Sequence, residues 1–278
     1  MKAPKLEPAK PGIVGKIRWK MVKTFMQTVG KSSNGVRLGY KYGFNSGTML
    51  DYVYLNKPQG RLGIGKLLDK TYLNAVGWRA IRNRRDLLQA VLRTELKKFR
   101  AEEEAIRLLD PAAGPGRYLQ ELLKEDPANI RVLCRDLKEE GLNQGRREAA
   151  ESGLDNIHFE VGDAFNPAPT TTLLGGPPNS LVVSGLYEQI PDDSTVKKSL
   201  QTFYDFLAPG GIIILTTQLQ HPQLDFVVNV MTSYSGGPFL LNCRPLEKIE
   251  GWVKDAGFSR ITSSVEKEGL CAVTVAYK

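Results

Sequence analysis

The sequence predicts an α/β protein whose core is a mostly parallel β-sheet with helices on both faces. From residue 105 onward, short β-rich runs alternate with helical stretches, as they do where helices connect parallel strands. The last two β-rich runs are separated only by a short segment at residues 266–269. They indicate a terminal hairpin, which leaves one antiparallel strand in an otherwise parallel sheet.

Charge and composition divide the chain into three parts. Residues 1–12 are rich in proline and lysine, and we expect them to be a disordered tail. Residues 1–100 contain 22 Lys and Arg but only 5 Asp and Glu, whereas residues 101–278 contain 16 and 25. We therefore expect residues 13–100 to form a basic cap or lid on an acidic α/β domain of residues 101–278.

The basic part begins with an expected amphipathic helix at residues 13–29. Ile13, Ile17, Met21, Phe25 and Val29 recur at every fourth position, and most of the lysines lie on the other side. Such a helix either packs on its own domain or lies on an anionic membrane surface.

Beyond this helix, residues 30–66 are rich in Gly, Asn and Tyr. We expect them to form a long loop of the kind that serves as a lid or binding segment. Two further helices are expected at residues 66–83 and 84–100.

The elements of the α/β domain follow in regular order. The expected strands cover residues 106–110, 130–135, 157–161, 180–184, 211–216, 258–265 and 271–277. The expected helices cover residues 117–125, 139–152, 193–207 and 245–256. This alternation places successive helices on the faces of one sheet.

A glycine-containing turn follows the first strand. The strand ends at Asp110, and Gly114 and Gly116 precede the next helix. Glycine lets the backbone turn tightly and approach a ligand closely, and the start of the helix offers free N–H groups. The turn is therefore a candidate ligand-binding loop, although such turns also contain glycine for geometry alone.

Two more acids end the next two strands. Asp136 ends the second strand, and Asp163 follows the third, immediately before Ala164. The carboxyl ends of parallel strands meet at one edge of the sheet, so the three carboxylates are expected to surround one ligand. A carboxylate accepts two hydrogen bonds from a ribose, and another accepts from an adenine amine, which indicates a nucleoside cofactor.

Residues from about Ala105 to Lys278 resemble the class I S-adenosylmethionine (SAM)-dependent methyltransferases. The resemblance rests on LLDPAAGPGRYL, VLCRDL, NIHFEVGDAF, SLVVSGLYEQIPD, FLAPGGIIILT and WVKDAGF. It implies a Rossmann-like seven-stranded sheet and SAM as the cofactor. Ala112 replaces the family's usual first glycine, and alanine fits there only if φ is negative. The N-terminal segment also resembles a little-studied bacterial subgroup of methyltransferases.

The resemblance implies a set of cofactor contacts. The glycine turn would hold the methionine part, the second acid the ribose, and the third acid the adenine. The implied residues are Asp110, Ala112, Gly114, Gly116, Asp136, Leu137, Asp163, Ala164, Ser184 and Gly185. A nicotinamide dinucleotide is the alternative, but the glycine spacing, the Gly-Asp-Ala motif and the final hairpin favour SAM.

Three residues are candidates for acting on the methyl acceptor. Tyr187 and Glu188 follow the fourth strand, and His221 follows the fifth. Each could orient the acceptor or take its proton, or serve only the local structure.

The N-terminal segment contributes further candidates. Tyr54, with Tyr40, Tyr42 and Tyr52, would exclude water or contact the sulfonium. Arg79, with Arg82, would reach the carboxylate of the cofactor or an anionic acceptor. The alternative is that the tyrosines belong to the core and the arginines face solvent.

Other features limit the class of protein. The sequence has no apolar run of membrane-spanning length, no secretory signal pattern, and three widely separated cysteines without metal-ligand spacing. We expect a cytoplasmic protein, either free or peripheral to a membrane, without a metal site.

These observations predict a SAM-dependent methyltransferase that acts on a small-molecule or lipid-like acceptor by in-line displacement. Two alternatives remain open. One is an RNA methyltransferase that uses the basic segment, although no recognisable RNA-binding motif is present. The other is a non-catalytic SAM-binding module.

Overall fold

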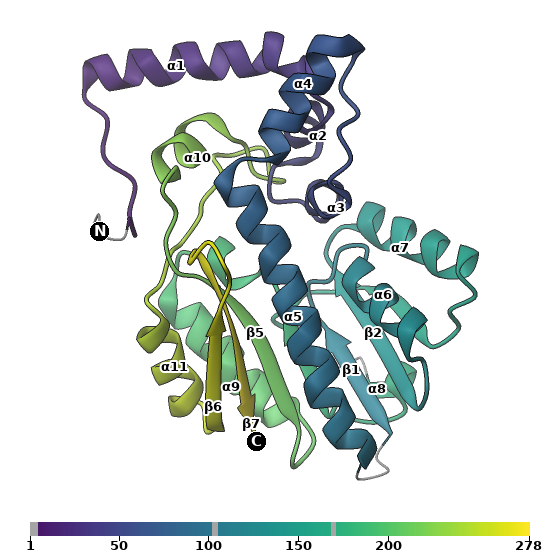
Figure 1. The fold of residues 1–278 in the computed structure, drawn as a ribbon. Coiled ribbons are helices and arrows are strands. Elements are labelled where there is room, and N and C mark those ends of the chain that lie inside the picture. Colours follow the sequence, from purple (N-terminus) through teal and green to yellow (C-terminus); the bar gives the residue numbers. More distant parts are fainter. Residues whose placement is uncertain (1–4, 102–104, 168–170) are drawn as a thin grey trace.

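The computed structural model describes residues 5–101, 105–167 and 171–278. These residues form a seven-stranded sheet with the order β3-β2-β1-β4-β5-β7-β6, and Figure 1 shows α5 Val76–Ala101 crossing in front of it. The strands are β1 Ile106–Asp110, β2 Ile130–Asp136, β3 Ile157–Val161, β4 Ser180–Val183, β5 Ile212–Gln218, β6 Ser259–Val265 and β7 Cys271–Tyr277. Strand β7 runs antiparallel to both β5 and β6, while the other pairs are parallel.

This arrangement confirms the expected Rossmann-like sheet with an antiparallel last strand. The chain proceeds from β1 to β3 toward one edge and then returns to β4 on the other side of β1. Such a reversal opens a crevice at the carboxyl ends of the strands, where ligands bind in open α/β sheets. The topology therefore places a binding site above β1 and β4.

Alternating side chains of the strands build a core on each face of the sheet. Leu108 packs with α5 Val76–Ala101 and α6 Arg117–Glu125 on one face. Its neighbour Leu109 packs with α9 Asp193–Phe206 and α11 Leu246–Asp255 on the other. The period-two alternation of a strand thus supplies both hydrophobic cores.

The expected helices of the α/β domain are present, and three short ones were not expected. The helix α7 Glu139–Glu151 matches its predicted range closely, as do α6, α9 and α11. The unexpected elements are α8 Thr171–Leu174, the 3₁₀ turn η3 Tyr187–Gln189 and α10 Leu224–Val230. Each has seven residues or fewer, too short to produce a clear periodic pattern.

The prediction of a long loop at residues 30–66 was wrong. This region forms η1 Val29–Ser32, α2 Asn34–Tyr42, α3 Gly47–Leu55 and the start of α4 Leu62–Leu73. The Ser33 side chain accepts a hydrogen bond from the Val36 amide and the Ser46 side chain accepts one from the Met49 amide, so the two serines cap α2 and α3. The polar clusters that indicated turns are therefore helix starts.

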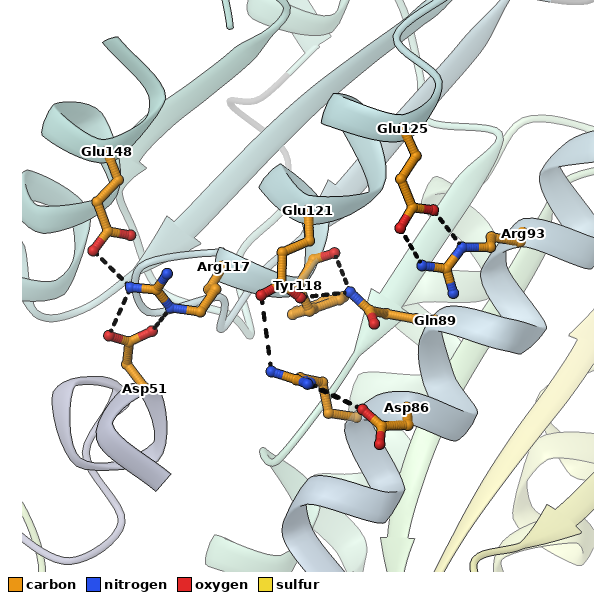
Figure 2. Close-up of polar contacts among 10 residues, drawn as sticks. Asp51, Asp86, Gln89, Arg93, Arg117, Tyr118, Glu121, Glu125 and Glu148 are labelled. Carbon is orange, nitrogen blue, oxygen red and sulfur yellow. Dashed lines mark hydrogen bonds and ion pairs between the residues drawn. The ribbon is translucent and has the colours of Figure 1, made fainter. Parts of the chain in front are cut away.

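The two helices expected at residues 66–83 and 84–100 are divided at a different place: α4 ends at Leu73, and a single helix, α5, runs from Val76 to Ala101. Several of its basic residues pair with acidic residues, most of them in the α/β domain. Arg79 pairs with Glu268, and Arg93 pairs with Glu125 (Figure 2). Part of the excess positive charge of the N-terminal segment is thus neutralised by the acidic domain beneath it.

The part of the predicted tail that is described, residues 5–12, has no helix or strand but does contact the protein. The Lys5 ammonium pairs with Asp225 of α10, and the Ala9 amide donates to the same carboxylate at 2.8 Å. These contacts differ from the expected free tail, while residues 1–4 lie outside the described residues.

The helix α1 Ile13–Gln27 packs on α10 with an unexpected face. Trp19 contacts Phe226 edge to face, with ring centroids 6.5 Å apart. The predicted apolar row instead faces outward: Ile13, Ile17, Met21, Phe25 and Val29 are all more than half exposed. The helix therefore packs on its own domain and still presents an apolar stripe.

The N-terminal helices are organised around the buried carboxylate of Asp69, which is fully buried. It accepts hydrogen bonds from the Ser33 hydroxyl at 2.6 Å, the Gly35 amide at 2.8 Å, the Gln59 amide at 2.8 Å and the Tyr52 hydroxyl. The Asp69 side chain on α4 thus binds both the start of α2 and the segment that connects α3 to α4.

Replacing this carboxylate should loosen the cap. We expect Asp69→Ala to lower the free energy of unfolding by about 1–3 kcal/mol, because buried donors lose their acceptor. Asp86→Ala, at an exposed position of α5, is the matched control and should change it by less than about 0.5 kcal/mol. Urea unfolding followed by circular dichroism measures both, and equal effects would contradict the role of Asp69.

Candidate active site

A cavity of about 420 Å³ lies at the carboxyl ends of the central strands. Asp110, Asp136, Asp163 and Ser184 line it from the ends of β1, β2, β3 and β4. The segments 41–54 and 233–240 form its other walls. Elements far apart in the sequence therefore meet around one space, and the predicted trio of acids converges there.

The floor of the cavity is the glycine turn. Gly114 and Gly116 have φ values of 55° and 64°, which favour glycine. A Cβ on Gly116 would lie 2.8 Å from the sulfur of Cys134, so this position also lacks room for a side chain. Ala112 is not among the residues with positive φ, so alanine fits the position where the family usually has glycine.

Asp110 shapes the turn from inside. Its carboxylate accepts a hydrogen bond from the Ala112 amide at 3.0 Å and another from the Tyr118 hydroxyl. Burial raises the pKa of Asp110 to about 7. These bonds hold the turn in place, so Asp110 acts mainly on the backbone that forms the floor.

Asp136 joins the turn to the second strand. Its two oxygens accept from the Gly114 amide and the Lys138 amide, each at 2.9 Å. Burial raises its pKa, and these amide bonds oppose the rise. Because each carboxylate oxygen has a second lone pair, the group can still accept from two hydroxyls of a ligand. Leu137 beside it is 59% exposed and adds an apolar surface to the cavity.

The Gly-Asp-Ala segment has a tightly packed support. A Cβ on Gly162 would lie 2.0 Å from the guanidinium of Arg135, which donates to the carbonyl of Asn166 at 2.8 Å. Asp163 is exposed and accepts from the Phe165 amide at 2.9 Å. Asp163 and Ala164 therefore stand at a fixed edge of the cavity.

A chain of hydrogen bonds connects the end of β4 to the opposite wall. The Gln189 amide group donates to the Gly185 carbonyl at 2.6 Å and accepts from Asn45 at 2.7 Å. Asn45 in turn accepts from the Tyr234 amide at 2.8 Å. Ser184 and Gly185 thus lie on the cavity as expected, whereas Asn45 and Gln189 were not predicted.

A charged cluster fixes α3 over the turn (Figure 2). Arg117, the residue after Gly116, pairs with Asp51 of α3 and with Glu148 of α7, the latter at 2.7 Å. Gln144 donates to Asp51 at 2.8 Å. The sequence offered no signal for this cluster, because Asp51, Arg117 and Glu148 lie on three different helices and are separated from one another by at least 31 residues.

Arg84 is another residue of the site that the sequence did not predict. It lines the cavity from α5 while being almost fully buried, and its guanidinium donates to Glu188 at 2.6 Å. Burial opposes the charge of Arg84, but the Glu188 carboxylate outweighs this and raises the arginine pKa. The pair places a guanidinium close to Gly185, at the edge where β4 ends.

The three residues predicted to act on the acceptor do not line the cavity. The Tyr187 hydroxyl bonds Ser199 at 3.1 Å, and burial raises its pKa. Glu188 is held by Arg84. His221 lines a different cavity. Their positions after strands were read correctly, but the backbone turns their side chains into the protein.

Only some of the candidate residues from the N-terminal segment line the cavity. Tyr54 lines the cavity, with the Arg85 guanidinium 5.3 Å from its ring centre. Tyr42 lines the cavity too, whereas Tyr40 and Tyr52 belong to the hydrophobic core. Arg79 pairs with Glu268, with 2.8 Å between Nε and Oε1, and does not line the cavity.

No group of three His, Cys, Asp or Glu side chains is placed to hold a metal ion in the part of the chain that the structure describes. The polar groups that do converge are backbone amides, which donate hydrogen bonds, and carboxylates, which can accept them from the hydroxyl and amine groups of a nucleoside.

The sheet order and the cavity define a Rossmann-like protein of the methyltransferase type, and solved structures share this fold. A possible exported protein from Bordetella parapertussis has a TM-score of 0.68 and 17% identity over 95% of both chains. The SAM-dependent methyltransferase SibL has a TM-score of 0.56 and 15% identity, covering 93% of this chain and 76% of that one. A putative O-methyltransferase from Nostoc punctiforme has a TM-score of 0.55 and 17% identity, covering 87% and 72%.

Sequence comparison identifies the family. Residues 3–278 match the model of a family described as "Putative methyltransferase", so the chain belongs to that family. It is also 39% identical over 264 residues to the uncharacterized protein YnbC of Escherichia coli strain K12. That alignment covers 94% of this chain but 45% of the relative, so this chain spans less than half the length of the curated protein it matches.

The raised pKa of Asp110 should appear in the pH dependence of stability. The folded protein holds this proton more tightly than the unfolded chain, whose carboxyl has a pKa near 3.8. Stability should therefore fall as pH rises from about 4 to about 7, by up to about 4 kcal/mol from this group. Asp110→Asn cannot ionise and should lack this loss.

Urea unfolding of both proteins between about pH 5 and pH 8 measures the difference. The free energy of unfolding of the unmodified protein should decline relative to the variant as pH increases. Parallel curves would show that Asp110 is already ionised across this range and would contradict the prediction.

Proposed function

We propose that the chain is a SAM-dependent methyltransferase acting on a small, apolar or lipid-like acceptor. The observation that carries the proposal is the convergence of the glycine turn, Asp136 and Asp163 on one cavity. When bound, SAM supplies an electrophilic methyl group on a positively charged sulfur. The protein's task is to position the two reactants and exclude water.

The residues around the cavity fit the parts of this cofactor. Asp136 has acceptor positions left for ribose hydroxyls, since one lone pair on each oxygen is used by a backbone amide. Asp163 and Ala164 also line the cavity, and they would form hydrogen bonds with the edge of the adenine ring. Gly114 and Gly116 line the cavity in the turn that would hold the methionine part.

One part of the remaining wall favours an apolar acceptor. Leu186 and Ile190 line the cavity after β4, and Pro238 and Leu240 line it from the 233–240 segment. Tyr234 adds an aromatic ring to the same wall. This surface can bury a hydrocarbon or aromatic group, which supports a lipid-like rather than a highly charged substrate.

The acceptor should need no histidine base. The lining residues include no histidine, and His221, Tyr187 and Glu188 point elsewhere. We therefore favour an acceptor atom that is already ionised near neutral pH, such as a carboxylate or an acidic hydroxyl. Its lone pair forms the new bond to the methyl carbon as the carbon–sulfur bond breaks, so no proton transfer is required.

Cofactor binding tests the proposal directly. Asp136→Ala and Asp136→Asn should weaken SAM binding by about 10- to 100-fold, since hydrogen bonds to a charged group contribute about 1.5–3 kcal/mol. Asp155→Ala, at an exposed site after α7, is the control and should leave binding unchanged.

Calorimetry with SAM and S-adenosylhomocysteine measures these affinities. Transfer of labelled methyl groups to a panel of carboxylic acids and phenols then tests the acceptor class. Absence of SAM binding by the unmodified protein would refute the function itself, whereas binding without transfer would point to a non-catalytic module.

We also propose that α1 contacts an anionic membrane surface. Its exposed stripe includes Ile13 at 80%, Ile17 at 57% and Met21 at 68% exposure, and Lys16 and Lys20 flank it in the sequence. Apolar side chains beside lysines are typical of helices that lie in a lipid interface. None of the described helices combines the length and hydrophobicity needed to cross a bilayer.

Vesicle binding tests this contact. The protein should sediment with vesicles that contain phosphatidylglycerol and much less with pure phosphatidylcholine. The double variant Ile17→Ser/Met21→Ser should bind at least about tenfold more weakly, because apolar burial is lost. Thr24→Ser on the same helix should behave like the unmodified protein. Equal sedimentation of the double variant would contradict membrane binding by the stripe and would favour a protein partner for it instead.

A further inference from the structure

A second cavity, of about 320 Å³, lies between the N-terminal helices and α10. Its deeper walls include Val36, Trp78, Val227, Met231 and Phe239, all of which are buried. It is separate from the candidate active site and was not suggested by any sequence motif. Nothing in the proposed methyl transfer requires it.

The chemistry of its walls selects an uncharged, apolar ligand group. The lining residues include no Asp, Glu, Lys or Arg. His221 is neutral near pH 7, since burial lowers its pKa to about 4, and its Nδ1 accepts from the Gln223 amide at 3.1 Å. The buried Tyr72 hydroxyl has no hydrogen-bond partner among the described residues. The interior therefore offers hydrocarbon contacts and very few polar ones.

The size of the cavity indicates a ligand. Protein interiors are packed so closely that voids larger than a water molecule are few, and apolar cavities of smaller volume than this one stay dry and bind small apolar molecules. A volume of about 320 Å³ falls within the range of small-molecule sites.

The mouth of the cavity continues the exposed stripe of α1. Phe25, Thr71 and Gln223 line the cavity and are exposed, so they mark its rim. Phe25 belongs to the apolar row of α1 and is 52% exposed. The exposed Lys70 precedes Thr71 on α4. A chain entering here would pass an apolar surface and leave a negative headgroup beside a lysine.

We propose that the second cavity binds the hydrocarbon chain of a single-chain anionic amphiphile of the fatty-acid class, with its carboxylate at the rim near Lys70. The apolar lining, the continuity of the rim with α1 and the exposed Lys70, which is next to the rim residue Thr71 in the sequence, support one occupant of this chemistry. A free fatty acid and a single-chain anionic lipid both have such a hydrocarbon chain, and they differ only in the headgroup that remains outside the cavity.

The two cavities share a wall. Pro238 and Leu240 line the candidate active site, whereas Phe239 and Leu241 line the second cavity. This alternation follows from the extended backbone, which is bridged between Thr232 and Pro238. Two adjacent leucines therefore provide matched probes, one for each cavity.

Methionine methyl NMR locates the ligand without any substitution. The chain has five methionines. Met26 and Met231 line the second cavity, Met21 is exposed on α1, and Met49 is fully buried in the adjoining hydrophobic cluster without lining the cavity. Titration with decanoate below its micelle-forming concentration should shift the signals of Met26 and Met231 saturably and shift that of Met49 much less. A shift of Met21 alone would show adsorption to the helix surface and would overturn the proposal, as would the absence of saturable shifts.

The leucine pair and the chain length provide the controls. Leu241→Trp should weaken decanoate binding at least tenfold by filling the cavity, whereas Leu240→Trp should change it less than about twofold. Affinity should rise roughly tenfold from octanoate to decanoate, since each buried methylene contributes about 0.8 kcal/mol. Equal effects of the two tryptophans, or displacement of decanoate by S-adenosylhomocysteine, would place the ligand in the active-site cavity instead and refute the assignment.

Comparing decanoate with decanol tests the headgroup. Decanoate should bind several-fold more tightly than decanol, and Lys70→Gln should remove this difference. Equal binding of the two in the unmodified protein would contradict the choice of an anionic ligand. Addition of lysophosphatidylglycerol in the same NMR assay distinguishes a single-chain lipid from a free fatty acid by which of the two binds more tightly.

Discussion

The architecture depends on the close approach of two backbones. Gly47 at the start of α3 and Gly114 in the glycine turn meet so closely that a Cβ on either would lie about 3.0 Å from the Cα of the other. Arg117 then fixes the same helix through Asp51. The N-terminal helices can cover the cavity only because both residues at this crossing are glycines, so neither backbone segment carries a side chain there.

This crossing explains how a basic segment and an acidic domain form one site. The excess positive charge of residues 1–100 is partly neutralised where α5 lies on the sheet, through pairs such as Arg93 with Glu125 and the buried Arg84 with Glu188. Basic residues of α1 such as Lys16 and Lys20 have no ion pair among the described residues. Part of the charge asymmetry therefore serves to attach the cap, while the lysines of α1 keep their charge at the surface.

The sequence predicts the sheet well and the cap poorly, for physical reasons. Strands with continuous β-branched and apolar runs, such as β5, are recognisable without context, and acids at strand ends must meet at one edge. The positions of Asp136 and Asp163 could thus be predicted. The short helices α2 and α3 depend on serine caps and on Asp69 from a later helix, and such distant contacts leave no periodic pattern. For the same reason Tyr187 and His221 were placed on the correct segments but with the wrong side-chain direction.

The alternating wall at residues 238–241 has a thermodynamic consequence. Leu240 and Leu241 face different cavities from one stretch of backbone. A ligand that displaces this segment in one cavity therefore also displaces a wall of the other cavity. Any change in affinity transmitted this way must be equal in both directions. A hydrocarbon ligand that raised the affinity for the nucleoside cofactor would itself bind more tightly once the cofactor was bound. The protein would then respond to the presence of both ligands together.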